Sequence, residues 1–135
     1  MKQVLFILLL AATSIAFGHS YSSFNDSLLI GTWTGTSLCQ VRSSPCHDEI
    51  AVCHISKGSK PNTFHFIMNK MVSGKEEDVG VLDYVYDASA RTLTSIDEKR
   101  KLVWKFTLMN KTMEGTLFYN NVLYRVIKLN KVIEK

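Results

Sequence analysis

The stretch KLVWKFTLMNKTMEGTLFYNNVLYRVIKLN, residues 101–130, carries the clearest structural pattern in this chain. At its start, apolar and mostly polar positions alternate, and the apolar set is Leu102, Trp104, Phe106 and Leu108. An alternation of period two is typical of a strand with one face on a core. Asn110-Lys111 and Asn120-Asn121 interrupt the pattern, and asparagine tolerates the positive φ that tight hairpin turns need. The stretch therefore predicts three antiparallel strands joined by short turns.

The rest of the chain continues this pattern toward the N-terminus. β-branched and aromatic residues dominate, turn residues recur at short intervals, and no segment after residue 28 has a helical period. The fold class is therefore predicted as all-β, a single small eight-stranded antiparallel up-and-down barrel, because closing the sheet removes its two exposed edges. The predicted strands are Leu29–Val41, Glu49–Lys57, Thr63–Val72, Asp78–Tyr86, Thr92–Ile96, Lys101–Met109, Thr112–Tyr119 and Val122–Asn130.

The N-terminus has the pattern of a cleaved secretory signal peptide. Lys2 precedes an apolar run from Val4 to Phe17 that is short for a membrane span, and small residues follow it. We predict a signal peptide over 1–18, with cleavage after Ser20 or an uncleaved anchor as alternatives. A flexible lead-in over 19–28, the barrel over 29–131 and a tail over 132–135 complete the division. The mature protein is predicted to be secreted or periplasmic, with no stable membrane span after cleavage.

The charge balance argues against a nucleic-acid partner. The 135 residues include 16 lysines and arginines and 12 aspartates and glutamates, which gives a net charge of +4. These basic residues are scattered apart from short runs such as Lys99-Arg100-Lys101, and such runs are usually solvated turns. With one core and no linker, the chain is predicted to be a monomeric single domain.

Three cysteines, evenly spaced by seven, allow one intramolecular disulfide. We predict a Cys39–Cys46 bridge that closes the loop between the first two strands, with Cys53 unpaired. The rival bridge would join Cys39 to Cys53. If Glu49 pairs near Gln40, Cys53 lies about 10 Å along the strand from Cys39, which is too far for a disulfide. A zinc site is the other alternative, but the spacing differs from that of structural zinc sites, and exported chains meet an oxidising environment. No metal site and no cofactor are predicted.

Several segments resemble small secreted lipocalin-like (calycin) β-barrel proteins of bacterial type. Gly31-Thr32-Trp33 matches the Gly-x-Trp signature on the first strand, and Arg125 lies on the last. The segments WTGTSLCQVRSSPCHDE, YDASARTLTS and MEGTLFYNNVLYRVIKLNK extend the resemblance over most of residues 29–131. The resemblance implies that Arg125 packs across Trp33 and closes one end of the barrel, as a guanidinium can over an indole ring. The chain lacks the helix that follows the last strand in the larger lipocalins, and it lacks the helical lid of fatty-acid-binding proteins. Both differences argue against a roomy pocket.

The motifs do not favour catalysis. No Gly-x-Ser-x-Gly is present, and the adjacent Cys-His pairs would point to opposite faces of a strand. The protein is therefore predicted to be a non-enzyme that binds a small apolar ligand. The alternative is a protein-interaction module, a secreted inhibitor or envelope accessory, with a barrel filled by its own side chains. Cavity size distinguishes the two. The candidate ligand-lining residues are Phe64, Phe66, Met68, Tyr84, Tyr86, Trp104 and Phe106.

The pattern leaves the inward face of the last hairpin open. Pairing across Asn120-Asn121 places Phe118 and Arg125 on one face, with Leu117 and Tyr124 on the other, and both faces are fairly apolar. If Arg125 points inward, Tyr124 must be exposed or covered by another surface.

Overall fold

A computed structural model describes residues 25–135, and the predicted signal peptide over 1–18 lies outside this range. The described chain consists of a short 3-10 helix and eight strands, which confirms the all-β prediction. No helix within 25–135 is both long and apolar enough to cross a membrane. The elements are η1 (Asp26–Leu28), β1 (Gly31–Cys39), β2 (Glu49–Lys57), β3 (Thr63–Val72), β4 (Lys75–Asp87), β5 (Thr92–Asp97), β6 (Leu102–Met109), β7 (Thr112–Tyr119) and β8 (Val122–Lys131).

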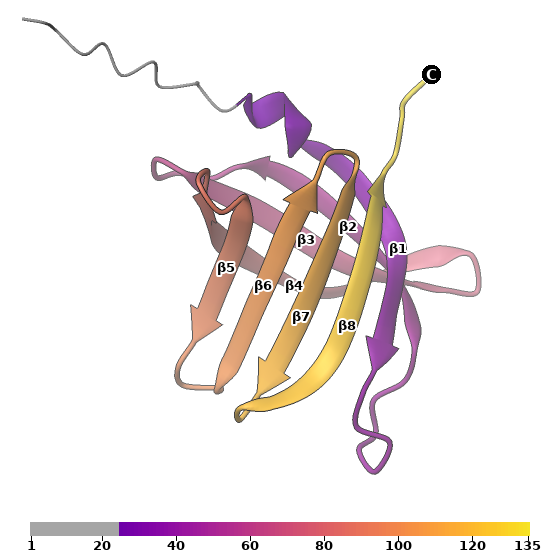
Figure 1. Ribbon diagram of the computed structural model, residues 1–135. Coiled ribbons are helices and arrows are strands. Elements are labelled where there is room, and N and C mark those ends of the chain that lie inside the picture. The colour runs from indigo at the N-terminus through magenta and orange to yellow at the C-terminus, as the bar shows by residue number, and fades with distance from the viewer. Residues whose placement is uncertain (1–24) are drawn as a thin grey trace, which may run out of the picture.

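The eight strands form a closed up-and-down barrel in which each strand pairs antiparallel with the next (Figure 1). Pairing of β1 with β8 closes the ring, with Trp33 opposite Lys131 at one end and Cys39 opposite Arg125 at the other. η1 lies at the end that contains Trp33, and the β1–β2 loop lies at the opposite end (Figure 1). This architecture is consistent with a lipocalin-like fold.

Tight turns join the strands where the sequence places asparagine, glycine and serine. Asn120 and Asn121 adopt φ values of 51° and 63°, as the predicted two-residue hairpin requires. Ser73 and Gly74, at 52° and 78°, form a turn of the same length between β3 and β4. Lys75 is therefore the first residue of β4. β4 begins three residues earlier than predicted as a result.

β1 is shorter than the predicted Leu29–Val41 because both of its ends are taken up by other structure. The amides of Leu29 and Ile30 donate to the Asp26 carbonyl, so these two residues continue the turn of η1 instead of starting the strand. Asn25 Oδ1 caps this turn by accepting from the Ser27 amide. Leu29 then enters the core with no exposed surface. At the other end the chain leaves β1 after Cys39 and enters the β1–β2 loop.

The core fills the barrel from the Trp33 end to its middle. Aromatic rings from β3, β4 and β6 contact one another there, with centroid separations of 4.2 Å for Phe66–Tyr84 and 5.7 Å for Tyr84–Phe106. Offset and edge-to-face contacts of this kind add to the free energy of apolar burial. The buried core consists of Leu29, Trp33, Cys53, Ile55, Phe64, Phe66, Met68, Tyr84, Tyr86, Leu93, Phe106, Leu108, Met113, Ile127 and Leu129.

Candidate functional site

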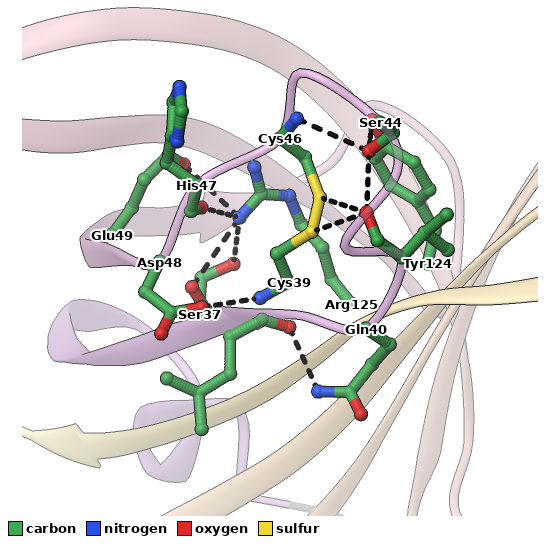
Figure 2. Close-up of a disulfide and its surroundings, with 12 residues drawn as sticks. Ser37, Cys39, Gln40, Ser44, Cys46, His47, Asp48, Glu49, Tyr124 and Arg125 are labelled. Carbon is green, nitrogen blue, oxygen red and sulfur yellow. Dashed lines mark hydrogen bonds and ion pairs between the residues drawn. A yellow bond between two sulfur atoms is a disulfide. The ribbon is translucent and has the colours of Figure 1, made fainter.

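The loop between β1 and β2 is held by a disulfide. Cys39 and Cys46 are bonded, with their Cα atoms 5.9 Å apart, and Cys53 is free and buried, as predicted. The carboxylate of Asp48 also accepts a hydrogen bond from the Cys39 amide at 2.8 Å (Figure 2). The bridge and this hydrogen bond fix the loop across one end of the barrel.

The strand register excludes the rival bridge more firmly than the sequence did. Glu49 pairs with Ser37, three residues from the predicted position near Gln40. Cys53 consequently lies opposite Trp33, six residues along β1 from Cys39. At about 3.3 Å per residue this is about 20 Å, far beyond the reach of a disulfide.

A β-bulge in β8, with Tyr124 as the extra residue, settles which face of the last hairpin turns inward. The register shifts between Leu117 and Phe118, so Leu117 lies opposite Arg125 and is buried, whereas Phe118 lies outside. Arg125 faces the barrel interior beside Ile127. Tyr124 lies on the outer wall, where the Ser44 hydroxyl donates to its hydroxyl at 3.3 Å and the ring of Tyr119 contacts its ring. The disulfide loop thus covers the tyrosine.

The prediction that Arg125 packs across Trp33 and closes the barrel is wrong, because Trp33 has a different partner. Arg125 pairs with Cys39, at the opposite end of β1 from Trp33, so a guanidinium on the indole would have to cross most of the barrel. Lys131 takes the position instead, with Nζ 5.9 Å from the centre of the Trp33 ring. Its ammonium also donates to the Leu28 carbonyl at 3.1 Å. Lys131 takes this role because the register of β1 against β8 places the end of β8 beside Trp33.

Arg125 instead joins the disulfide loop to β1. Its Nη1 donates to the His47 carbonyl at 2.9 Å and to the Ser37 hydroxyl at 3.2 Å, and lies 3.5 Å from a carboxylate oxygen of Glu49 (Figure 2). The arginine side chain is only 12% exposed. The ion pair with Glu49 compensates much of the cost of burying this charge.

A small cavity of about 50 Å³ lies at this end of the barrel interior. Arg125 and Glu49 line it on one side, and Asn69, whose Oδ1 is buried without a hydrogen-bond partner, lines it on another. The cavity is well below the ~300–1,000 Å³ of typical ligand pockets. Of the predicted ligand-lining residues, Met68, Trp104 and Phe106 line it, whereas the other four fill the core: Phe64, Phe66, Tyr84 and Tyr86.

A side opening in the barrel wall adjoins this cavity. β4 and β5 pair at only three positions, and every other pair of neighbouring strands shares six or more. A cleft of about 330 Å³ lies where these strands separate, between β4 on one side and β5 and β6 on the other. It is lined by Met68, Val79, Gly80, Val81, Leu82, Ser95, Asp97, Arg100, Leu102 and Trp104.

The cleft and the cavity share the side chains of Met68, Val79 and Trp104. Val79 is the extra residue of β4 where the β3–β4 register shifts, with Met68 opposite Gly80 and Asn69 opposite Asp78. Sequence reasoning missed Val79 and Asn69 because a bulge leaves no periodic signal in a single strand. Trp104 was found through the alternation of β6.

The histidines of β2 and β3 pair with carboxylates on β4. His54 Nε2 lies 2.8 Å from Glu76, and His65 Nδ1 lies 2.7 Å from Asp83. Hydrogen bonds from Asn69 and His54 lower the pKa of Glu76. In residues 25–135, no three histidine, cysteine or acidic side chains gather as a metal site would require. The disulfide removes Cys39 and Cys46 as thiolate ligands.

Cys53 lines the cavity as a protonated thiol, since burial raises its pKa from 9.0 to about 12. The folded state therefore holds this proton more tightly than the unfolded state. The resulting stability is complete below pH ~9 and is lost as the pH rises toward 12, by about 1.4 kcal/mol per pH unit. At pH ~10.5 the loss attributable to Cys53 is expected to be about 2 kcal/mol.

Urea unfolding of the wild type and of Cys53→Ala over this pH range measures the effect. Burial also raises the pKa of Tyr84, which destabilises both proteins at alkaline pH. The charge of the Cys53 thiolate also raises the pKa of Tyr84, so the difference between the two curves reports the thiol together with its effect on Tyr84. Parallel curves would show that the thiol titrates alike in the folded and unfolded states.

Comparison with known proteins finds no protein-family model and no curated protein that matches this sequence. The fold and the site define the chain as an eight-stranded antiparallel β-barrel. One end is packed with aromatic side chains, and the other carries a disulfide-bonded loop and a cleft in the wall.

Proposed function

We propose that this protein is an exported lipocalin-like barrel that binds a small apolar ligand in the cleft between β4 and β6. One observation carries the proposal: the cleft of about 330 Å³ shares Met68, Val79 and Trp104 with the interior cavity. Together the two spaces reach the lower end of the size range of small-molecule sites. The disulfide supports an oxidising compartment, secreted or periplasmic.

The lining gives such a ligand an apolar wall and a polar end. Leu82, Leu102 and Trp104 would contact its apolar body in the cleft. Ser95, Asp97 and Arg100 also line the cleft, and in the adjoining cavity Asn69 Oδ1 is free to accept a hydrogen bond. The proposal needs no cofactor and assigns no catalytic step to the protein.

Titration with Nile red and with a medium-chain fatty acid tests this proposal. Saturable binding at micromolar level, about −8 kcal/mol, is expected. Trp104→Ala should weaken it about tenfold, because an indole side chain contributes much of the apolar contact. Circular dichroism confirms that the variant is folded.

Tyr119→Ala is the matched control, because this aromatic side chain is 50% exposed on the outer wall and lies outside the cleft and the cavity. It should bind both probes as the wild type does. Equal weakening by the two variants would contradict a site in the cleft. No saturable binding at all would favour the alternative of a protein-interaction module with a filled barrel.

A further inference from the structure

We propose that the free edge of β4, residues 76–84, binds an extended peptide segment of a partner protein as an added strand. The partner segment would alternate basic and apolar side chains. The backbone and the charges of the barrel wall would hold the added strand, so its binding does not require that the cleft also takes a small ligand.

The pairing pattern of β4 leaves a strand edge open in an otherwise closed barrel. β4 pairs with β3 at ten positions, from Val85 back to Lys75. Its pairing with β5 covers only Val85, Tyr86 and Asp87. In a strand every second residue turns its N–H and C=O toward the neighbour on one side. Between residues 76 and 84, the groups on the β5 side therefore have no partner strand within the described chain.

The surroundings of this edge suit the side chains of an added strand. The cleft beside it presents Leu82, Leu102 and Trp104, which are apolar and partly buried. Val79 and Val81, which border the cleft, are 52% and 51% exposed. Because successive residues of a strand point to opposite faces, alternate side chains of the peptide would enter the cleft, and the others would lie over the outer wall.

The charge of the edge indicates a basic partner. The segment EEDVGVLDY, residues 76–84, contains four carboxylates and no basic residue. Glu76 and Asp83 are engaged by His54 and His65. The other two, Glu77 and Asp78, are exposed, and neither makes a side-chain hydrogen bond or ion pair with any of residues 25–135. Because Glu77 and Asp78 are successive residues and point to opposite faces, a lysine or arginine on one face of an added strand would meet one of these carboxylates directly. Its charge would also be attracted by the other carboxylate.

The same charges argue against a second copy of this chain as the occupant. Two antiparallel β4 edges centred on Gly80 would place Glu77 of each copy opposite Asp83 of the other. Like charges directly opposite one another destabilise strand pairs. Natural proteins protect free edges with charged side chains in this way, and a segment of opposite charge is not repelled.

Fluorescence anisotropy with a labelled synthetic peptide of about ten residues, alternating lysine and valine, tests the proposal on the mature protein. Saturable binding that weakens with added salt is expected. The double variant Glu77→Lys/Asp78→Lys should weaken binding about tenfold, as the reversal of two exposed charges beside the peptide predicts. It should leave the binding of Nile red unchanged, which separates this result from a failure of the ligand site.

Two controls separate strand addition from general attraction between charges. Glu114→Lys/Glu134→Lys makes the same change in net charge far from β4 and should bind the peptide as the wild type does. A peptide N-methylated at alternate amides keeps its lysines but cannot donate to a strand edge, so its binding should be lost. The proposal would be overturned if the methylated peptide bound as well as the unmodified one. It would also be overturned if both double variants weakened binding equally, or if the unmodified peptide showed no saturable binding. Self-association through β4 in size-exclusion chromatography would overturn it in favour of a second copy.

Discussion

Trp33→Ala is expected to lower the free energy of unfolding by about 4 kcal/mol. The indole has no exposed surface, and its Nε1 donates to the Leu29 carbonyl at 2.8 Å. Lys131 lies over the ring, and Leu29 beside it is itself fully buried. Removing the indole therefore leaves a large cavity and an unpaired carbonyl at the closed end of the barrel. Denaturant unfolding followed by circular dichroism measures the loss.

Two variants show whether this loss has the stated origin. Trp33→Phe keeps much of the packing but loses the hydrogen bond. Its free energy of unfolding should therefore be about 1–2 kcal/mol below that of the wild type. Arg125→Ala should leave the fluorescence of Trp33 unchanged, measured in a Trp104→Phe background, because the two side chains lie at opposite ends of β1. A change in Trp33 emission in this variant would instead support contact between Arg125 and Trp33, as the resemblance implied.

Gly35→Ala is expected to destabilise the barrel by about 3 kcal/mol, the upper end of the usual range for overpacking. A Cβ atom at this position would lie 1.8 Å from the carbonyl oxygen of Lys128. This atom belongs to the backbone of β8, so the clash cannot be relieved by rotating a side chain. The substitution must push β1 and β8 apart at the seam that closes the ring.

Gly80→Ala is the matched control for this seam. It is also a strand glycine, but a Cβ atom there would meet nothing within 4 Å, and its φ is not positive. Its stability should stay within about 0.5 kcal/mol of the wild type. Thermal unfolding of the two variants compares them directly. If Gly35→Ala unfolds at the same temperature as Gly80→Ala, the close approach of β1 and β8 does not contribute as described.

Trp33→Ala and Gly35→Ala probe the filled half of the barrel, whereas the functional proposals concern the other half. The aromatic core and Trp33 give the molecule a rigid end. Toward the disulfide loop the interior contains a small cavity, a buried arginine and an opening in the wall. Trp104 is less buried than Phe106 on the same strand because β4 does not pair with β5 across from it.

The sequence alone was enough for the features that depend on near neighbours. Alternation along β6 reports which residues face a core, because successive side chains of a strand point to opposite faces. Asn120-Asn121 predicts its own hairpin, since two consecutive positive φ values suit few other residues. The Cys39–Cys46 bridge closes a loop so short that the chain itself brings the two thiols together.

Only the tertiary structure decided the features that depend on how distant strands slide past one another. The register of β1 against β8 placed Lys131 on Trp33 and sent Arg125 to the loop, and the resemblance alone implied the reverse. The bulges at Val79 of β4 and Tyr124 of β8 set which side chains reach the cavity. The separation of β4 from β5 opened the wall. Registers and bulges are fixed by packing around the whole ring, and a shift of one residue reverses every side chain beyond it, so no single strand encodes them.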